Sequence, residues 1–444
     1  MPERRRRLLY VSSNHLSVRP GGLESYTQDL YEAFQRSDAF EPIYIARAGE
    51  PFTEDASPNG SSPFAIVGAD PNQYLLYTDT FAAPHPYDAL LGRRPDKQVL
   101  TRYFSDFLRA QKPDIVHFHH TNFFGYDVLR VTRNALPNVP IVYTLHEYLA
   151  ICHRDGQMVR TQSNELCRES SPRRCHECFP EVTAQAFAMR KTFIQSQLSL
   201  VDLFVAPSEY VRDRYVDWGL PAHKVRVEPQ GKVPVTERAS GGPTRARNRF
   251  AFFGTLNPYK GADVLLDAMK RLGEDFDGHL WIFGANLEIQ GEKFKQVLES
   301  RFDEGKVTFA GPYDQSQLGS LMSQIDWVVV PSIWWETGPM VVVEAFEHGR
   351  PVICSDIGGM SEKVANGING LHFRRGDSDH LAEIMWRAAE TPGLWDRLQA
   401  GIPPDPPRTM DDHVQVLSVL YEQLLAERAR PAADQSPSEE LARA

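Results

Sequence analysis

The segment RFAFFGTLNPYKGADVLLDAMKRL, residues 249–272, contains the pattern that decides the fold class. It begins with a continuous apolar run, which is typical of a strand covered on both faces, as in a parallel sheet. Apolar residues then recur at helical spacing. They share one face of the predicted helix and are Val264, Leu265, Ala268 and Leu272. The segment therefore predicts a strand, a loop and an amphipathic helix, in that order.

The same unit recurs along the chain. In the first half the apolar runs are RLLYVSS, PIYIARA, DIVHFHH, IVYTLHE and DLFVAPS. In the second half they are RFAFFGTL, HLWIFGA, KVTFAG, DWVVVPS and PVICSD. Alternating strands and helices predict an α/β fold with doubly wound sheets. Because the alternation occurs twice, we expect two Rossmann-like domains that face a cleft, with ligands at the carboxyl ends of the strands.

A stretch rich in glycine, proline, serine and charge, VTERASGGPTRARNR, separates the two halves. A long amphipathic pattern follows the second half and is expected to pack back on the first. The predicted parts are an N-terminal domain 1–234 with a cysteine-rich insertion 150–180, a linker 235–249, a C-terminal domain 250–408, a helix 409–430 and a disordered tail 431–444.

The composition is that of a globular protein, with 42% hydrophobic and 24% charged residues. A net charge of -10 argues against nucleic acid, whose phosphates require a basic face. No apolar run approaches the roughly 20 residues that span a bilayer. The start, MPERRRRLLYVSS, is interpreted as a first strand and not as a signal peptide, so a cytoplasmic location is expected. Its arginines are either solvated or in peripheral contact with an anionic membrane face.

Two carboxylates stand in the otherwise apolar segment WWETGPMVVVEAF, residues 334–346. Buried carboxylates are costly unless something pairs with them. Glu336 lies in a loop after the strand DWVVVPS, and a helix is predicted from Gly338 or Pro339, since proline suits the first helical position. Glu344 then lies more than one turn inside that helix.

The start of this helix is a candidate phosphate site. Free N–H groups from Met340 and Val341 onward, together with the helix dipole, attract an anion. Because a carboxylate can accept hydrogen bonds from two sugar hydroxyls, Glu344 suits a ribose diol and Glu336 suits a hexose. The alternative is a capped helix with Glu344 in a buried salt bridge.

Two other loops follow strands in a similar way. In PGGLESYTQDL, Gly21 and Gly22 would let the backbone approach a phosphate closely. In FFGTLNPYKG, Gly254 has the same property and Lys260 supplies a cation for a diphosphate. Taken singly, these features are more typical of an ordinary turn and of a surface lysine than of a phosphate site.

Together these segments resemble glycosyltransferase family 4, whose members are retaining enzymes of the GT-B fold. The resemblance covers residues 8 to 425, and its most specific element is the pair of glutamates eight positions apart in PSIWWETGPMVVVEAFEHGRPVI. The matching positions are Gly21, Gly22, His146, Phe253, Gly254, Leu256, Lys260, Gly261, Glu336 and Glu344.

The resemblance implies transfer of a hexosyl-type sugar from a UDP- or GDP-sugar to an acceptor hydroxyl, with retention and without a metal or other cofactor. In this scheme His146 and Glu336 orient the hexose, and Lys260 stabilises charge on the departing diphosphate. A phosphate oxygen of the leaving group takes the acceptor proton. One position departs from the family, because Thr255 stands where many members carry an arginine that contacts the diphosphate. Thr255 with local amides could substitute for it, or another basic residue, of which Lys363 is one example.

The family context implies polysaccharide, glycolipid or natural-product assembly, with a glycan, glycolipid or small molecule as acceptor. Two alternatives stay open: a nucleotide-sugar epimerase on the same fold, and a catalytically silent GT-B scaffold, which the loss of arginine at Thr255 would favour. The sequence does not indicate an oligomeric state.

Three histidines end the strand in DIVHFHHTN, at the edge that faces the predicted cleft. We expect the acceptor to bind near His119 or His120. The alternative is that these histidines pack or cap without contacting a ligand. Their spacing differs from the helical pattern of zinc proteases.

Four of the five cysteines cluster in a polar stretch that ends in a C-x₂-C pair; they are Cys152, Cys167, Cys175 and Cys178. This composition is compatible with a structural tetrathiolate zinc site, which would stabilise an insertion with few apolar residues. Free thiols and two disulfides are the alternatives, and a reducing compartment disfavours the disulfides. The fifth, Cys354, lies in an apolar strand and is expected in the core.

Overall fold

The computed structural model of this chain describes residues 4–18, 21–47, 63–77, 97–233, 246–285, 287, 290–302, 305–403 and 408–429. Most of the predicted linker 235–249 and all of the predicted tail 431–444 lie outside the described residues. No disorder or linker conformation is therefore assigned to them.

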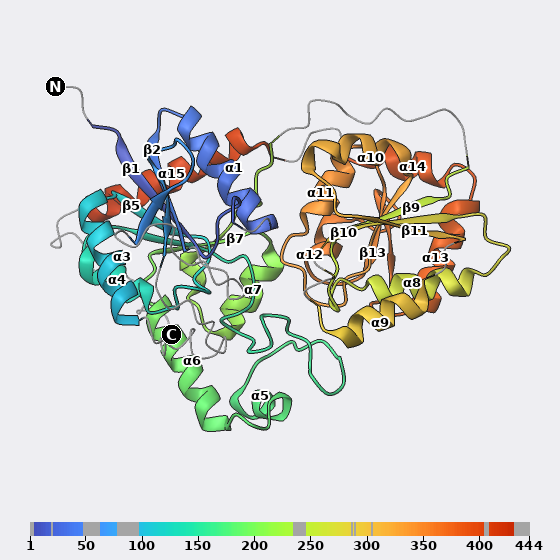
Figure 1. The fold of residues 1–444 in the computed structure, drawn as a ribbon, viewed down its shortest axis with the longest axis horizontal. Helices are drawn as coiled ribbons and strands as arrows, with labels where there is room; N and C mark the ends of the chain where they lie inside the picture. The colour runs from blue at the N-terminus through green and yellow to red at the C-terminus, as the bar shows by residue number, and fades with distance from the viewer. Residues whose placement is uncertain are drawn as a thin grey trace, which may run out of the picture.

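An eight-stranded sheet organises the N-terminal half, with strand order β3-β4-β2-β1-β5-β6-β7-β8 (Figure 1). All neighbouring strands pair in parallel except β3 with β4. The strands are β1 Arg6–Ser12, β2 Phe40–Arg47, β3 Phe64–Ile66, β4 Gln73–Leu76, β5 Ile115–Phe118, β6 Ile141–Thr144, β7 Leu203–Ala206 and β8 Val225–Val227. The helices are α1 Gly22–Arg36, α3 Lys97–Gln111, α4 Val128–Ala135, α5 Pro172–Cys178, α6 Ala184–Leu198 and α7 Glu209–Trp218, with a 3₁₀ turn at Ala222–Lys224.

A six-stranded, fully parallel sheet organises the second half, with order β11-β10-β9-β12-β13-β14. The strands are β9 Arg249–Thr255, β10 His279–Ala285, β11 Val307–Gly311, β12 Trp327–Val330, β13 Val352–Ser355 and β14 Gly370–Phe373. The helices are α8 Ala262–Leu272, α9 Glu292–Arg301, α10 Leu318–Gln324, α11 Met340–Glu347, α12 Gly358–Lys363, α13 Ser378–Glu390, α14 Leu394–Ala400 and α15 Met410–Ala429, with a 3₁₀ turn at Gln315–Gln317.

The predicted fold class, with two doubly wound α/β domains, is confirmed. The deciding segment 249–272 forms β9 and α8. Its strand is buried from Phe250 to Phe253 because the sheet has helices on both faces (Figure 1). Continuous apolar runs are the pattern that such doubly covered strands require.

The last described helix, α15, lies beside α1 in the N-terminal half (Figure 1). The Tyr421 and Phe34 rings are 6.0 Å apart, and the Tyr26 hydroxyl lies 2.7 Å from His413 Nε2. The chain therefore crosses from one domain to the other twice. The two passages meet where the Lys232 N–H donates to Arg408 O at 3.0 Å and the Met410 N–H donates to Lys232 O at 2.8 Å.

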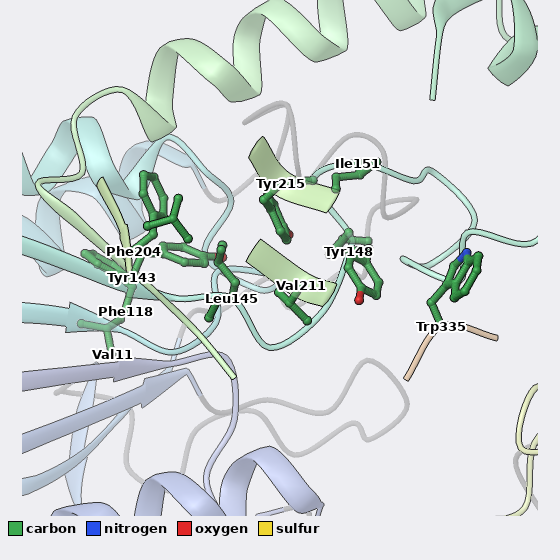
Figure 2. Packing of buried hydrophobic residues seen from close by; sticks show 14 of the residues in the cluster. Val11, Phe118, Tyr143, Leu145, Tyr148, Ile151, Phe204, Val211, Tyr215 and Trp335 are labelled. Carbon is green, nitrogen blue, oxygen red and sulfur yellow. The ribbon is translucent and has the colours of Figure 1, made fainter. Parts of the chain in front are cut away.

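One apolar cluster extends from the first sheet into the second. Figure 2 shows Trp335, from the segment after β12, on the far side of Tyr148 and Ile151 from the first sheet. Its indole ring stacks on Tyr210 of α7, with ring centroids 4.8 Å apart. The loop between β12 and α11 is therefore held against the N-terminal half.

Candidate active site

Glu336 lies in the loop after β12 and is only 4% exposed. Its Oε1 accepts hydrogen bonds from Lys260 Nζ at 2.7 Å, Ser332 Oγ at 2.6 Å and Trp334 Nε1 at 2.8 Å. A buried carboxylate is tolerated when several donors, one of them charged, satisfy it. The carboxylate is therefore held in one orientation at the carboxyl end of the sheet.

The loop that carries Lys260 is fixed by a local turn and by a glycine. The Tyr259 and Lys260 amides donate to Asn257 Oδ1 at 2.9 and 3.1 Å. Gly261 has φ 71°, and a Cβ at this position would lie 2.0 Å from Pro331 O. Only glycine fits, because the loop after β9 packs directly on the loop after β12. The resemblance marked both Lys260 and Gly261, and the structure brings Lys260 to Glu336.

The helix α11 begins at Met340, with Pro339 as its N-cap, close to the start predicted from the sequence. Pro339 contributes no side-chain cap, so the first turn retains amide donors and the positive end of the dipole. Gly338 lies beside α12, where a Cβ would be 3.9 Å from Lys363 Cε. Lys363, named above as a substitute for the missing arginine, therefore lies beside this helix start.

Glu344 lies on α11 and is 9% exposed. Its Oε1 accepts from Gln315 Nε2 at 3.1 Å and lies 3.5 Å from Lys232 Nζ. The buried salt bridge considered as an alternative is therefore present. It does not exclude a ligand, since an oxygen already facing a cation can also accept from hydroxyls. Burial raises the pKa of the nearby Tyr313, and the charge of Glu344 raises it further.

Two hydrogen bonds at Thr337 tie the Glu336 loop to the N-terminal half, and Trp335 Nε1 donates a third to Cys167 O at 3.2 Å. Thr337 Oγ1 donates to His146 O at 3.0 Å, and Ser208 Oγ donates to Thr337 O at 2.8 Å. The segment after β6 and the segment after β12 therefore meet. Of the predicted catalytic residues, Lys260 and Glu336 are in direct contact, and His146 is joined to them through Thr337.

Both ring nitrogens of His146 have protein partners. Nδ1 accepts from Gln230 Nε2 at 3.1 Å, and Nε2 lies 3.2 Å from His119 Nδ1. Burial lowers the pKa of His146 well below its usual value, and the neighbouring His119, His120 and His413 lower it further. The ring is therefore neutral at pH 7, and a direct bond to a sugar requires exchange of one of these partners.

His119 and His120 lie in different surroundings. His119 is 1% exposed, and burial lowers its pKa well below the usual value. His120 keeps 17% of its side chain exposed, and its Nδ1 is engaged by the Asn122 amide at 3.0 Å and Ser13 Oγ at 2.9 Å. Only His120 is placed to meet a ligand without rearrangement.

Glu147 was not singled out from the sequence. Its Oε1 lies 3.8 Å from His120 Nε2, and 21% of its side chain is exposed. Burial raises the pKa of Glu147 to about 8, partly offset by Arg190. In the sequence it is one of many acids, and only its position directly after His146 distinguishes it.

The two predicted glycine loops differ from each other. Gly21 is the extended N-cap of α1, and a Cβ at this position would lie 2.4 Å from Glu24 Oε2, so a side chain there would displace the end of Glu24. A Cβ on Gly22 would meet nothing within 4 Å, so this position does not require glycine for its own packing. Residues 19 and 20 lie outside the described residues. Gly254 has φ 144° at the end of β9, a conformation that side chains rarely adopt. Thr255 follows it as the last residue of the strand.

The zinc prediction at Cys152, Cys167, Cys175 and Cys178 is not supported. Within the described ranges, no group of three or more histidine, cysteine or acidic side chains is placed to hold a metal ion. All four thiols are free and partly buried. Cys167 Sγ donates to Glu169 O at 3.2 Å, and burial raises the pKa of Cys152 to about 12.

The insertion is held together by other contacts. It also buries apolar residues, whereas the sequence suggested that it had few of them. Met158 and Val159 are at most 2% exposed, and Met158 joins the main apolar cluster. Arg154 Nη1 donates to Val159 O and Arg160 O at 2.9 Å each. Arg160 pairs with Glu177 of α5 at 2.8 Å. These interactions connect the segments of the insertion to one another.

Each of the N-terminal arginines Arg4 to Arg7 bonds to a group of the protein itself. The partners include Asp114 with Arg4 at 3.0 Å, Phe40 O with Arg5 at 2.6 Å, and Glu422 with Arg6. Contact with a membrane remains a prediction. No helix in the described part of the chain is long and apolar enough to cross a bilayer.

Comparison with known proteins gives the family. The model "Glycosyltransferase Family 4" matches residues 20–231, and the model "Glycosyl transferases group 1" matches residues 247–391. A D-inositol 3-phosphate glycosyltransferase from Nocardia farcinica is 27% identical over 378 residues, which is 82% of this chain and 76% of that protein.

Solved structures share the architecture. Sucrose-phosphate synthase from Thermosynechococcus elongatus superimposes with a TM-score of 0.66 at 17% identity, covering 95% of this chain and all of that one. Anabaena HepE in complex with UDP and glucose gives 0.59 at 18% identity, covering 95% and 98%. Both halves match in order and both sheets match the GT-B architecture, so the chain belongs to the family 4 glycosyltransferases of the GT-B fold.

Proposed function

We propose that this glycosyltransferase moves a hexosyl-type sugar from a UDP- or GDP-sugar to an acceptor hydroxyl, with retention of the anomeric configuration. The observation that carries the proposal is the buried Glu336, held by Lys260 and joined through Thr337 to His146. A fixed acceptor beside a cation suits a sugar linked to a diphosphate. HepE, which shares the fold, was crystallised with UDP and glucose.

The donor would lie along the loops after β9 and β12. Glu336 would accept from hexose hydroxyls and Glu344 from the ribose diol. The diphosphate would meet the start of α11, from Gly338 and Pro339 to Met340 and Val341, where amide donors remain. On the other side of the donor, the loops at Gly254 and Thr255 and at Gly21 and Gly22 would approach it with backbone groups.

In the transfer, the bond between the anomeric carbon and the phosphate oxygen breaks while the bond to the acceptor oxygen forms. A leaving-phosphate oxygen takes the acceptor proton, so no separate general base is needed. Lys260 would stabilise the charge that grows on the diphosphate, without a metal. Lys363 beside Gly338 would supply the second cation that Thr255 cannot.

The acceptor would enter from the first sheet, at His120. His120 Nε2 and Glu147 Oε1 are 3.8 Å apart and both partly exposed, a spacing that one hydroxyl can bridge. Ser13, His120 and Glu147 follow β1, β5 and β6, which are neighbouring strands that end at one edge. An uncharged hydroxyl suits this position better than a phosphate, because burial keeps both the Glu147 carboxyl group and the His120 ring neutral at pH 7, with pKa values of about 8 and about 4, so that neither offers a positive charge.

A thermal-shift screen against UDP-, GDP- and ADP-sugars tests the donor, followed by nucleotide release on adding candidate acceptors. We expect one nucleotide to raise the melting temperature and Glu344→Ala to weaken its binding by about tenfold or more, through the loss of hydrogen bonds to a charged group. Product stereochemistry distinguishes retaining transfer from epimerisation. Binding without turnover would favour the silent scaffold, and unchanged affinity in Glu344→Ala would reject the donor placement.

A further inference from the structure

Lys232 connects the two passages of the chain between the domains. Its backbone pairs with Arg408 and Met410 of the returning segment, at 3.0 and 2.8 Å. The residue is 7% exposed, so its ammonium group cannot rely on water to stabilise its charge. Its position is therefore set by the junction of the domains.

The side chain of Lys232 reaches α11 of the second domain. Its Nζ lies 2.6 Å from Glu347 Oε2 and 3.5 Å from Glu344 Oε1. The two acids are three residues apart, on one helical face, and are 6% and 9% exposed. Two like charges buried side by side favour proton uptake by one of them unless a cation is present.

We propose that Lys232 is a positioning residue for donor binding: it offsets the neighbouring charge of Glu347, directs Glu344 toward the donor ribose, and makes this dependent on the domain junction. The inference rests on the proposed function, since it assigns Glu344 to the nucleotide. Glu347 would anchor the ammonium group at the shorter distance. Glu344 would keep its capacity to accept from the two hydroxyls of the diol.

Other titratable or charged groups act on the same cluster. They are Asp29 from α1, Tyr313 from the loop after β11, and His348 and Arg350 after α11. Burial lowers the pKa of His348 to about 4, assisted by Lys232 and Arg350, so this ring stays neutral at pH 7. Burial raises the pKa of Asp29 to about 6 and Lys232 opposes the rise. Lys232 therefore faces three acids, of which two lie on the helix that would bind the donor.

The test compares the unaltered protein with Lys232→Met, Lys232→Arg and Lys232→Met/Glu347→Gln, using UDP and GDP as probes in calorimetric titrations at pH 6, 7 and 8. In Lys232→Met we expect affinity to fall by about tenfold at pH 7, and by more at pH 6, because a protonated Glu344 accepts fewer hydrogen bonds. Lys232→Arg should retain affinity within about threefold, since arginine keeps the charge.

Removal of the second acid supplies the decisive control. If Lys232 acts by offsetting two neighbouring charges, then Glu347→Gln in the Lys232→Met background should restore affinity to within about threefold and flatten its pH dependence. A folded Lys232→Met with unchanged affinity overturns the proposal. So does a loss that is independent of pH and is not rescued by Glu347→Gln.

If Lys232→Met does not fold, the double variant Lys232→Met/Glu347→Gln alone tests the proposal. Affinity near that of the unaltered protein supports the proposal, and a loss of more than about tenfold overturns it. If neither nucleotide binds the unaltered protein, the proposed function fails and this inference fails with it. That outcome differs from the case in which the unaltered protein binds a nucleotide and Lys232→Met binds it with the same affinity.

Discussion

The two edges that meet at the Thr337–His146 contact use different electrostatics. On the first-domain edge, polar groups are neutral imidazoles and hydroxyls that bond to one another, such as His146 with His119 and His117 with Tyr421. On the second-domain edge, acids are paired with lysines, as in Lys260 with Glu336 and Lys232 with Glu347. The first edge therefore offers neutral hydrogen-bonding groups, and the second carries charges that could pair with a charged ligand.

The charged edge predicts the largest effect. Lys260→Ala should lower turnover by about 10²–10³-fold, because a donor aimed at charge developing on the leaving group is lost. Affinity for the nucleotide should change by less than about fivefold, since the α11 amides remain. Steady-state kinetics and calorimetry separate the two quantities.

Lys270→Ala is a matched control on the helix that follows the same loop. Lys270 is exposed and donates to Ser300 O at 2.8 Å, away from the acids. Its activity should match that of the unaltered protein. If Lys260→Ala instead weakened binding and left turnover unchanged, Lys260 would be a binding residue, and the charged edge would have no special role in the transition state.

The sequence indicated part of each edge: Lys260 and Glu336 on the charged edge, and His119, His120 and His146 on the neutral edge. Glu336 and Lys260 are separated by 76 positions, yet each follows a recognisable strand, so the topology of a parallel sheet predicts that they meet. The apolar runs predicted the strands for the same reason, because a doubly covered strand must be apolar throughout.

Lys232 and Glu147 had no such signal. Lys232 lies in QGKVPV, a segment without periodicity, and meets Glu347, which is 115 positions later. The tertiary packing of α15 and of the returning segment sets that contact, and local pattern does not encode it. The spacing of the four cysteines suggested a metal site that the described residues do not support, and the burial of Met158 and Val159 in the same insertion had no signal in the sequence.

The neutral histidines of the first-domain edge predict that the N-terminal half loses stability at acidic pH. In the described chain, six histidines of the N-terminal half and α15 have a lowered pKa, against two in the second half. Burial, assisted by the charge of Arg408, lowers the pKa of His413 to about 3. Below pH 6.5, such a ring is neutral in the folded protein and protonated in the unfolded chain. The stability it contributes is therefore present above pH 6.5 and lost as the pH falls, at up to about 1.4 kcal/mol per pH unit for each fully buried ring.

Hydrogen exchange at pH 7.5 and pH 5.0, corrected for intrinsic rates, measures this by region. We expect β5, β6 and α15 to lose more protection at pH 5.0 than β12 and β13. Glu147 and Asp29 act in the opposite sense, since their raised pKa values make protonation stabilising, but they are two groups against six histidines. Equal loss in both halves would contradict the comparison, and His223→Gln at an exposed position should have no effect.

The smallest expected effect tests whether the neutral edge orients an acceptor. His120→Ala removes the Nε2–H that faces Glu147, and should raise the acceptor KM by about tenfold, the value of one hydrogen bond to a bound hydroxyl. Glu147→Gln should have a weaker effect at pH 7, because the protonated acid and the amide offer similar groups. The measurement uses whichever uncharged polyol supports nucleotide release, with nucleotide affinity as the control. If both variants left the acceptor KM unchanged while lowering nucleotide affinity, this pair would belong to the donor side, and the division between an orienting edge and a charged edge would fail.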